Sequence, residues 1–189
     1  MDKLIEEILK LKTFNRLKLV YRRNTVGDRK ESSAEHSWSC LILADYFLDK
    51  IRQKLDRLKI YELLAYHDIV EIESGNIHID SKEYLEDNIE KENLAAKKLK
   101  EKLPSNIASQ FFVLFKEYQE QKTIESKYAK AINALDPIIL GLDYKPKWKG
   151  LSRDFLTKQK EPFLKEFPPL LEYFHELLDY CEREGYFNQ

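Results

Sequence analysis

The chain has 189 residues, of which 32 are Lys or Arg and 33 are Asp or Glu, so its formal net charge is -1. This balance argues against a protein that binds nucleic acid through bulk charge, and no apolar run reaches the roughly 20 residues that span a bilayer. The first residues include acids where a signal peptide needs a basic flank. Cys40 and Cys181 are too few for a disulfide scaffold, so we expect a soluble cytoplasmic protein.

Apolar residues recur at helical spacing along most of the chain, and alternating strand-like runs are scarce. We expect helices at the following residues: 2–12, 33–53, 57–69, 81–102, 105–121, 124–143 and 168–184. The segment 143–150 shows no periodicity and is expected to be a loop. These elements predict an all-α fold, a compact multi-helix bundle over 1–143 with 144–189 as a C-terminal loop and helix packed on it.

Some expected helix starts carry cap chemistry. Ser32, with Glu35 three residues on, predicts a capping box. Pro104 separates two helical patterns, and Ser105 is expected to cap the second. A further cap pair is expected before the long charged helix: Asp80 and Glu83.

Polar side chains occupy three otherwise apolar helix faces. His36 lies on the apolar face of the second expected helix, and His67 lies on that of the third, with Asp68 directly after it. Asp136 lies on the apolar face of the helix expected at 124–143. A buried lone carboxylate costs several kcal/mol unless it is paired, neutralised or bound to a cation. Each histidine alone could be a hydrogen-bonded core residue, but together the four side chains suit one divalent cation such as Mn, Fe, Co, Ni or Zn.

The order of these residues resembles a known signature. His36, then His67-Asp68, then Asp136 is similar to the H…HD…D pattern of HD-domain metal-dependent phosphohydrolases. Three stretches resemble the 5'-deoxynucleotidase-like branch of that superfamily: ESSAEHS, HDIVEIESG and EYQEQKTIESKYAKAINALD. The resemblance covers roughly residues 15–143.

The resemblance implies roles for individual residues. His36, His67, Asp68 and Asp136 would bind one divalent metal, with Mg added to the candidates. Glu71 would orient or deprotonate the attacking water, and it lies one turn after His67 if the helix continues.

An arginine near the substrate is also implied, and either Arg22 or Arg23 can take that position; both could instead be surface charges. Asn76 stands where the family usually has Asp, and Asn133 stands where relatives often have Asp. Asn76 is a candidate substrate-binding residue, and so is Trp38, which could stack on a base or serve only in packing.

The implied reaction is hydrolysis of a nucleoside 5'-monophosphate, preferably the deoxy form, to a nucleoside and phosphate. Three alternatives stay open: another phosphate ester as substrate, a nucleoside triphosphate as substrate, and a catalytically weak nucleotide-binding protein. Relatives in the branch also imply a homodimer, for which the C-terminal amphipathic helix could supply a surface.

Overall fold

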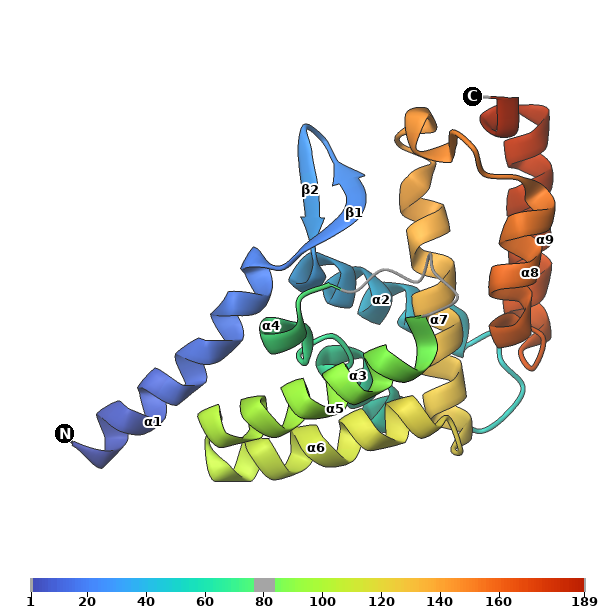
Figure 1. Cartoon of the computed structure of the whole chain (residues 1–189). Helices are drawn as coiled ribbons and strands as arrows, with labels where there is room; N and C mark the ends of the chain where they lie inside the picture. Colours follow the sequence, from blue (N-terminus) through green and yellow to red (C-terminus); the bar gives the residue numbers. More distant parts are fainter. Residues whose placement is uncertain (1, 77–83, 189) are drawn as a thin grey trace.

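The computed structural model describes residues 2–76 and 84–188. Helices make up most of this part of the chain, so the expected all-α fold is confirmed (Figure 1). The long helix α7 runs through the molecule and contacts α2, α3, α6 and α8. The elements in chain order are α1 (Lys3–Leu11), η1 (Lys12–Leu19), β1 (Tyr21–Val26), β2 (Arg29–Ser32), α2 (Ser33–Leu48), α3 (Arg57–Tyr66), α4 (Glu71–Ser74), α5 (Tyr84–Lys102), α6 (Ser105–Glu120), α7 (Ile124–Gly141), η2 (Lys145–Trp148), α8 (Arg153–Leu164), α9 (Pro168–Arg183) and η3 (Tyr186–Asn188).

The strands β1 and β2 form an antiparallel hairpin that the sequence analysis did not predict. Gly27 lies in its turn with a φ of 59°, a conformation that glycine adopts without a steric penalty. The pair Gly27-Asp28 directly follows the β-branched Thr25 and Val26, and this is the local signal for the turn. The hairpin carries Arg22 toward the N-terminal end of α2.

The helix α2 begins where the capping box predicts. The backbone N–H of Glu35 donates to the Ser32 hydroxyl at 3.3 Å, and the Glu35 carboxylate accepts the Ser32 N–H at 2.9 Å. The cap expected at Ser105 is wrong, because Pro104 takes the N-cap position and no side chain caps the helix. The other expected cap pair lies outside the described residues: Asp80 and Glu83.

The helix expected at 57–69 ends earlier than its apolar pattern suggests. The helix α3 stops at Tyr66, and a turn follows before α4 begins at Glu71. His67 is therefore the C-cap residue of α3, and Glu71 belongs to the separate short helix α4. The turn changes the direction of the chain between two residues that a continuous helix would have placed on one face.

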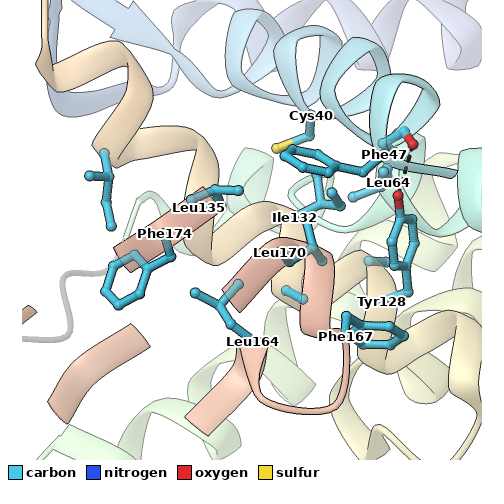
Figure 2. Close-up of a cluster of buried hydrophobic side chains, with 14 of the residues drawn as sticks. Cys40, Phe47, Leu64, Tyr128, Ile132, Leu135, Leu164, Phe167, Leu170 and Phe174 are labelled. Carbon is cyan, nitrogen blue, oxygen red and sulfur yellow. Dashed lines mark hydrogen bonds between the residues drawn. The ribbon is translucent and has the colours of Figure 1, made fainter. Parts of the chain in front are cut away.

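The C-terminal segment packs on α7 and shares its core (Figure 2). The segment expected to be a loop contains η2, whose Trp148 is 2% exposed and donates its indole N–H to the Gly141 carbonyl at 2.8 Å. The sequence analysis did not predict the helix α8, which contains Pro162, a residue type that usually ends a helix. Buried side chains of the tail join those of α7 in one cluster: Leu164, Phe167, Leu170, Phe174, Leu178 and Cys181. The tail is thus part of the main core.

Two amphipathic helices differ in what covers their apolar faces. The apolar stripe of α9 is buried inside this chain and offers little to a second copy. The helix α1, by contrast, has no buried residue, and Leu4 and Ile8 are 66% and 58% exposed. The homodimer stays a prediction. Among the described residues, no helix is both long and apolar enough to cross a membrane.

Candidate active site

Four buried side chains meet where α2, α3 and α7 come together. His36 comes from α2, His67 and Asp68 follow the end of α3, and Asp136 comes from α7. All four are at most 8% exposed. The structure therefore brings together the residues that the H…HD…D pattern singles out, although they are far apart in the sequence.

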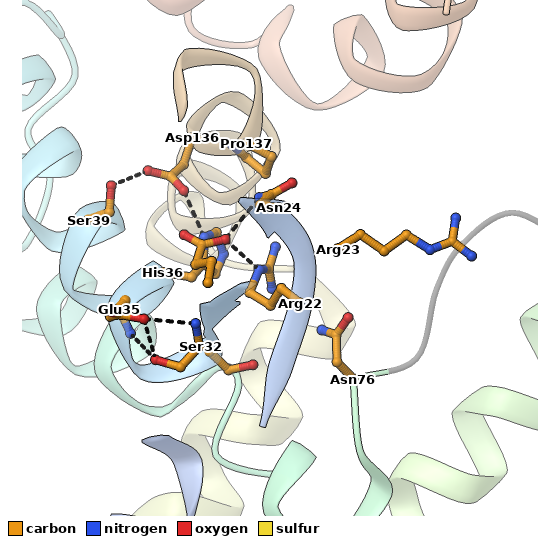
Figure 3. Close-up of polar contacts among 12 residues, drawn as sticks. Arg22, Arg23, Asn24, Ser32, Glu35, His36, Ser39, Asn76, Asp136 and Pro137 are labelled. Carbon is orange, nitrogen blue, oxygen red and sulfur yellow. Dashed lines mark hydrogen bonds and ion pairs between the residues drawn. The ribbon is translucent and has the colours of Figure 1, made fainter. Parts of the chain in front are cut away.

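His36 is held between two side chains of α7, of which Figure 3 shows Asp136. Its Nδ1 donates to Asp136 Oδ2 at 2.7 Å, and its Nε2 lies 2.9 Å from Asn133 Oδ1. The other oxygen of Asp136 accepts a hydrogen bond from the Ser39 hydroxyl. The imidazole ring is thus fixed from both edges.

Within the described residues, one ring nitrogen of His67 has a hydrogen-bond partner and the other has none. Its Nδ1 donates to the Leu64 carbonyl at 2.7 Å, which leaves the lone pair on Nε2. This Nε2 is buried, has no hydrogen-bond partner among the described residues, and lies 3.1 Å from Asp68 Oδ1. Burial lowers the pKa of His67 to about 4, so the ring is neutral and its Nε2 can bind a cation.

Asp68 links the two histidines to Arg22. Its Oδ2 lies 3.9 Å from His36 Nε2 and accepts a hydrogen bond from Arg22 at 3.2 Å. Burial alone would raise the pKa of Asp68, but its electrostatic interactions with the neighbouring His67, His36 and Arg22 side chains lower it, so the group stays a carboxylate. Arg22 also pairs with Glu31 at 3.2 Å.

The structure distinguishes the two candidate arginines. Arg22 points into the cluster, whereas Arg23 is exposed and Figure 3 shows it directed away from His36. The alternation of side chains along β1 explains the difference, since neighbouring residues of a strand face opposite sides.

Glu71 stands at the edge of the cluster and is held by two neighbours. Ser33 donates its hydroxyl to Oε2, and Asn76 donates its amide to Oε1 at 2.7 Å. Burial, together with the negative charge of Asp68, raises the pKa of Glu71 to about 8. A carboxyl group that titrates near neutral pH is suited to accept and release protons.

Three half-buried lysines add positive charge around the cluster. Lys130 places its Nζ 4.9 Å from the centre of the Tyr118 ring, which itself lies 5.3 Å from the His67 ring. Lys147, from η2, donates to the Pro137 carbonyl at 2.7 Å. Lys160, from α8, has no hydrogen-bond or ion-pair partner within residues 2–76 and 84–188. Burial and the charges of Lys130 and Arg22 lower its pKa to about 8.

A sequence model of the HD domain matches residues 14–170. The chain belongs to the HD-domain family. It is 28% identical over 155 residues to the Xenopus laevis protein named 5'-deoxynucleotidase HDDC2, and this match covers 81% of the chain and 74% of the relative. The human protein of that name is 25% identical over 134 residues, which cover 71% of the chain and 63% of the relative.

A solved structure also resembles this HD-domain chain over nearly its whole length. It is the crystal structure of a protein named as a predicted metal-dependent phosphohydrolase, from Magnetospirillum magnetotacticum MS-1, with a TM-score of 0.85 and 26% identity. The likeness covers 97% of this chain and 95% of that one. The shared fold thus includes the segment after residue 143, and the family match also continues beyond the boundary expected there.

The donors of the HD-domain chain fit a divalent metal. Two imidazoles and two carboxylates form a set of the type that binds borderline cations, and the unpartnered Nε2 of His67 is an orphaned buried lone pair. Cys40 and Glu31 also lie near His36. Burial raises the pKa of the Cys40 thiol well above its usual value, so it remains protonated and is a poor ligand. Glu31 is already engaged by Arg22 and by Asn24 at 2.9 Å.

Several residues of the site were given no role by the sequence analysis. Asn24 and Ser39 lie outside the stretches that resemble the family, and no periodicity places them inside. Three others lie within those stretches, which are the signal that could have found them: Glu31, Ser33 and Tyr118. Trp38 was a candidate but is 66% exposed and lies outside the buried cluster, so it is not a core packing residue, and base stacking stays a prediction.

Proposed function

We propose that this chain is a metal-dependent phosphohydrolase that cleaves nucleoside 5'-monophosphates, the deoxy forms first, into nucleoside and phosphate. The buried His-Asp cluster carries the proposal, since His67 Nε2 is unpartnered among the described residues and Glu71 lies close enough for the charge of Asp68 to raise its pKa. Similarity to proteins named 5'-deoxynucleotidase supports the choice of substrate.

His36, His67 and Asp68 would hold the metal together with a fourth protein donor, for which the sequence predicts Asp136. When bound, a divalent cation lowers the pKa of a coordinated water and polarises a phosphoryl oxygen. The donor types allow Mn, Co, Fe, Ni, Zn or Mg.

Glu71 would act as the general base. As a carboxylate it takes a proton from the attacking water, whose oxygen bonds to phosphorus. The bond between phosphorus and the 5' oxygen then breaks, and that oxygen takes up a proton and leaves as the nucleoside hydroxyl. Ser33 and Asn76 keep the carboxylate in place through their hydrogen bonds to its two oxygens.

Arg22 would neutralise the phosphate charge, and Lys147 and Lys160 of the C-terminal segment would add positive charge around the site. Its Nη1 contacts Asp68 at 3.2 Å, so its guanidinium lies beside the proposed metal donors. Burial lowers the pKa of Lys147 and of Lys160 to about 8, and the charge of Arg22 contributes to both shifts, so these cations lie within electrostatic reach of one another. Such a group of half-buried cations favours an anionic ligand.

The test is release of inorganic phosphate from a panel of nucleoside and deoxynucleoside 5'-monophosphates with Mn, Co or Mg. Glu71→Gln keeps the shape of the side chain and should lower the rate by about 10²–10⁴ while metal binding persists. Glu73→Gln is the matched control, since Glu73 lies on the same short helix but pairs with Arg16 and Lys102. An unchanged rate in Glu71→Gln would reject its proposed role.

A nucleoside triphosphate is the second candidate substrate, favoured by the number of cations around the site. Release of tripolyphosphate alone from triphosphates, without phosphate from monophosphates, would favour that candidate. Nucleotide binding without hydrolysis of any panel member would favour the catalytically weak protein. A cytoplasmic location stays a prediction.

A further inference from the structure

A lysine occupies the inward face of the helix α8. Leu156, Lys160 and Leu164 follow one another at a spacing of four residues, so their side chains share one face of the helix. Both leucines are buried in the core cluster, at 6% and 0% exposure. Lys160 therefore lies on the face of α8 that packs into the core, where α7 is a neighbouring helix (Figure 1). The pattern of an amphipathic helix would place an apolar residue at this position.

Two other lysines lie within electrostatic reach of Lys160. The charges of Lys130 and Arg22 both lower the pKa of Lys160, and the charge of Lys160 in turn lowers the pKa of Lys147. The three lysines come from three separate elements, α7, η2 and α8. We call Lys130, Lys147 and Lys160 the lysine group.

The lysine group adjoins the predicted metal donors. Lys147 Nζ donates at 2.7 Å to the carbonyl of the residue that directly follows Asp136 in α7. Lys130 Nζ lies 4.9 Å from the centre of the Tyr118 ring, and that ring centre lies 5.3 Å from the centre of the His67 ring. Positive charge is thus concentrated beside the buried donors.

The carboxylates of the site do not neutralise the lysine group. Glu31 and Asp68 pair with Arg22, each at 3.2 Å, and Asp136 accepts two hydrogen bonds from other side chains. Within residues 2–76 and 84–188, none of the three lysines forms an ion pair. Cations withdrawn from water without a counter-charge cost stability, and an anion that binds between them removes part of that cost.

We infer that the lysine group is an anion subsite that holds the phosphate group of a nucleotide without the help of the metal. An ammonium ion binds phosphate oxygens as a point charge, and a dianion needs more than one such partner. The inference rests on the proposed function for the identity of the ligand, a nucleotide phosphate. It extends that function, because it lets the nucleotide bind before the metal and requires no hydrolysis.

The test is binding of inorganic phosphate to the metal-free full chain at pH 7, measured by titration calorimetry. A chelator removes the metal and is then dialysed away. The parent should bind phosphate, and Lys147→Met and Lys160→Met should each raise the Kd by about 5–10-fold, because each removes one ammonium but keeps the hydrocarbon stem. A deoxynucleoside 5'-monophosphate should displace the phosphate, whereas the nucleoside without phosphate should not.

Matched controls are available on the same two elements. Lys145 lies in η2 and donates to a backbone carbonyl at 2.9 Å, as Lys147 does, and Lys158 is exposed on α8. Lys145→Met and Lys158→Met should keep the Kd of the parent. An unchanged Kd in both Lys147→Met and Lys160→Met would overturn the inference. So would phosphate binding that appears only after Mn²⁺ is added, or bound phosphate that the nucleotide fails to displace.

Thermal unfolding gives an independent readout. In phosphate-free buffer, Lys160→Met should raise the Tm, because an apolar side chain replaces a cation that lacks a counter-charge. Added phosphate should raise the Tm of the parent more than that of Lys160→Met. A lower Tm of Lys160→Met in phosphate-free buffer would show that Lys160 stabilises the fold by itself, and the inference would be wrong. A chain that binds phosphate as expected but hydrolyses no nucleotide would reject the proposed reaction and leave the subsite standing.

Discussion

The helix α7 supports two buried clusters of opposite character. One face carries Asn133 and Asp136 into the polar cluster around His36, and the adjacent face carries Ile132 and Leu135 into the apolar core shared with the tail. The apolar cluster stabilises the fold by removing hydrocarbon from water. The polar cluster removes charges from water and costs stability until a cation binds it. Changes in one cluster should therefore affect folding, and changes in the other should affect chemistry.

The largest effect is expected from His67→Ala in the polar cluster. Removing the unpartnered Nε2 deletes a proposed metal donor, and a bound metal contributes several kcal/mol to transition-state stabilisation. The phosphatase rate should fall by at least about 10³, with loss of metal shown by elemental analysis. His175→Ala is the control, since His175 pairs with Glu161 near the surface. A His67→Ala variant that retains metal and rate would contradict the site.

Phe174→Ala tests the apolar cluster. Phe174 is fully buried, and replacing such a side chain with Ala costs about 3–5 kcal/mol of unfolding free energy. Urea denaturation should show this loss, while the Co²⁺ affinity of the folded protein stays unchanged. Phe155→Ala, at 45% exposure on α8, should cost much less. A large change of Co²⁺ affinity in folded Phe174→Ala would show that the two clusters are coupled.

The contrast between the apolar and the polar cluster also explains which features the sequence could predict. The period of apolar residues predicts most helices and the inward direction of His36, because burial follows helical spacing. The resemblance to the HD pattern then brings His36, His67, Asp68 and Asp136 together. Periodicity carries no information on which atoms meet, so the contact between His36 Nε2 and Asn133 required coordinates.

The spacing of apolar residues also failed to predict short or interrupted elements. The strands β1 and β2 are too short and too polar for a clear alternation. The helix α8 contains Pro162, and local reasoning treats an internal proline as a helix end. Both elements reach the site, since one carries Arg22 and the other carries Lys160. Tertiary packing decides their conformation, which local preferences do not capture.

The protonation of Glu71 makes the stability of the metal-free fold depend on pH. Its folded pKa of about 8 lies above the ordinary value of 4.5, so the metal-free folded chain holds a proton that the unfolded chain releases. Stability should therefore fall as pH rises from about 5 to 8. Glu71→Gln lacks this titration, so its stability relative to the parent should increase over that range by at least about 1.4 kcal/mol, one pKa unit. Denaturation at several pH values checks this, and a parallel pH dependence in both proteins would contradict it.

The smallest effect is expected from replacing Lys160. This residue lies on α8 in the C-terminal segment and contributes a positive charge to the polar cluster. Lys160→Met keeps the hydrocarbon stem but removes a half-buried cation near Arg22 and Lys130, so the KM for a nucleoside monophosphate should rise by about 5–10-fold with little change in kcat. Lys158→Met, exposed on the same helix, should leave KM unchanged. Because the pKa of Lys160 is lowered to about 8, the parent should lose phosphate affinity as pH rises above 8, and Lys160→Met should lose less. Equal KM values at pH 7 in the parent and in Lys160→Met would show that the tail stabilises the fold without contributing to substrate binding.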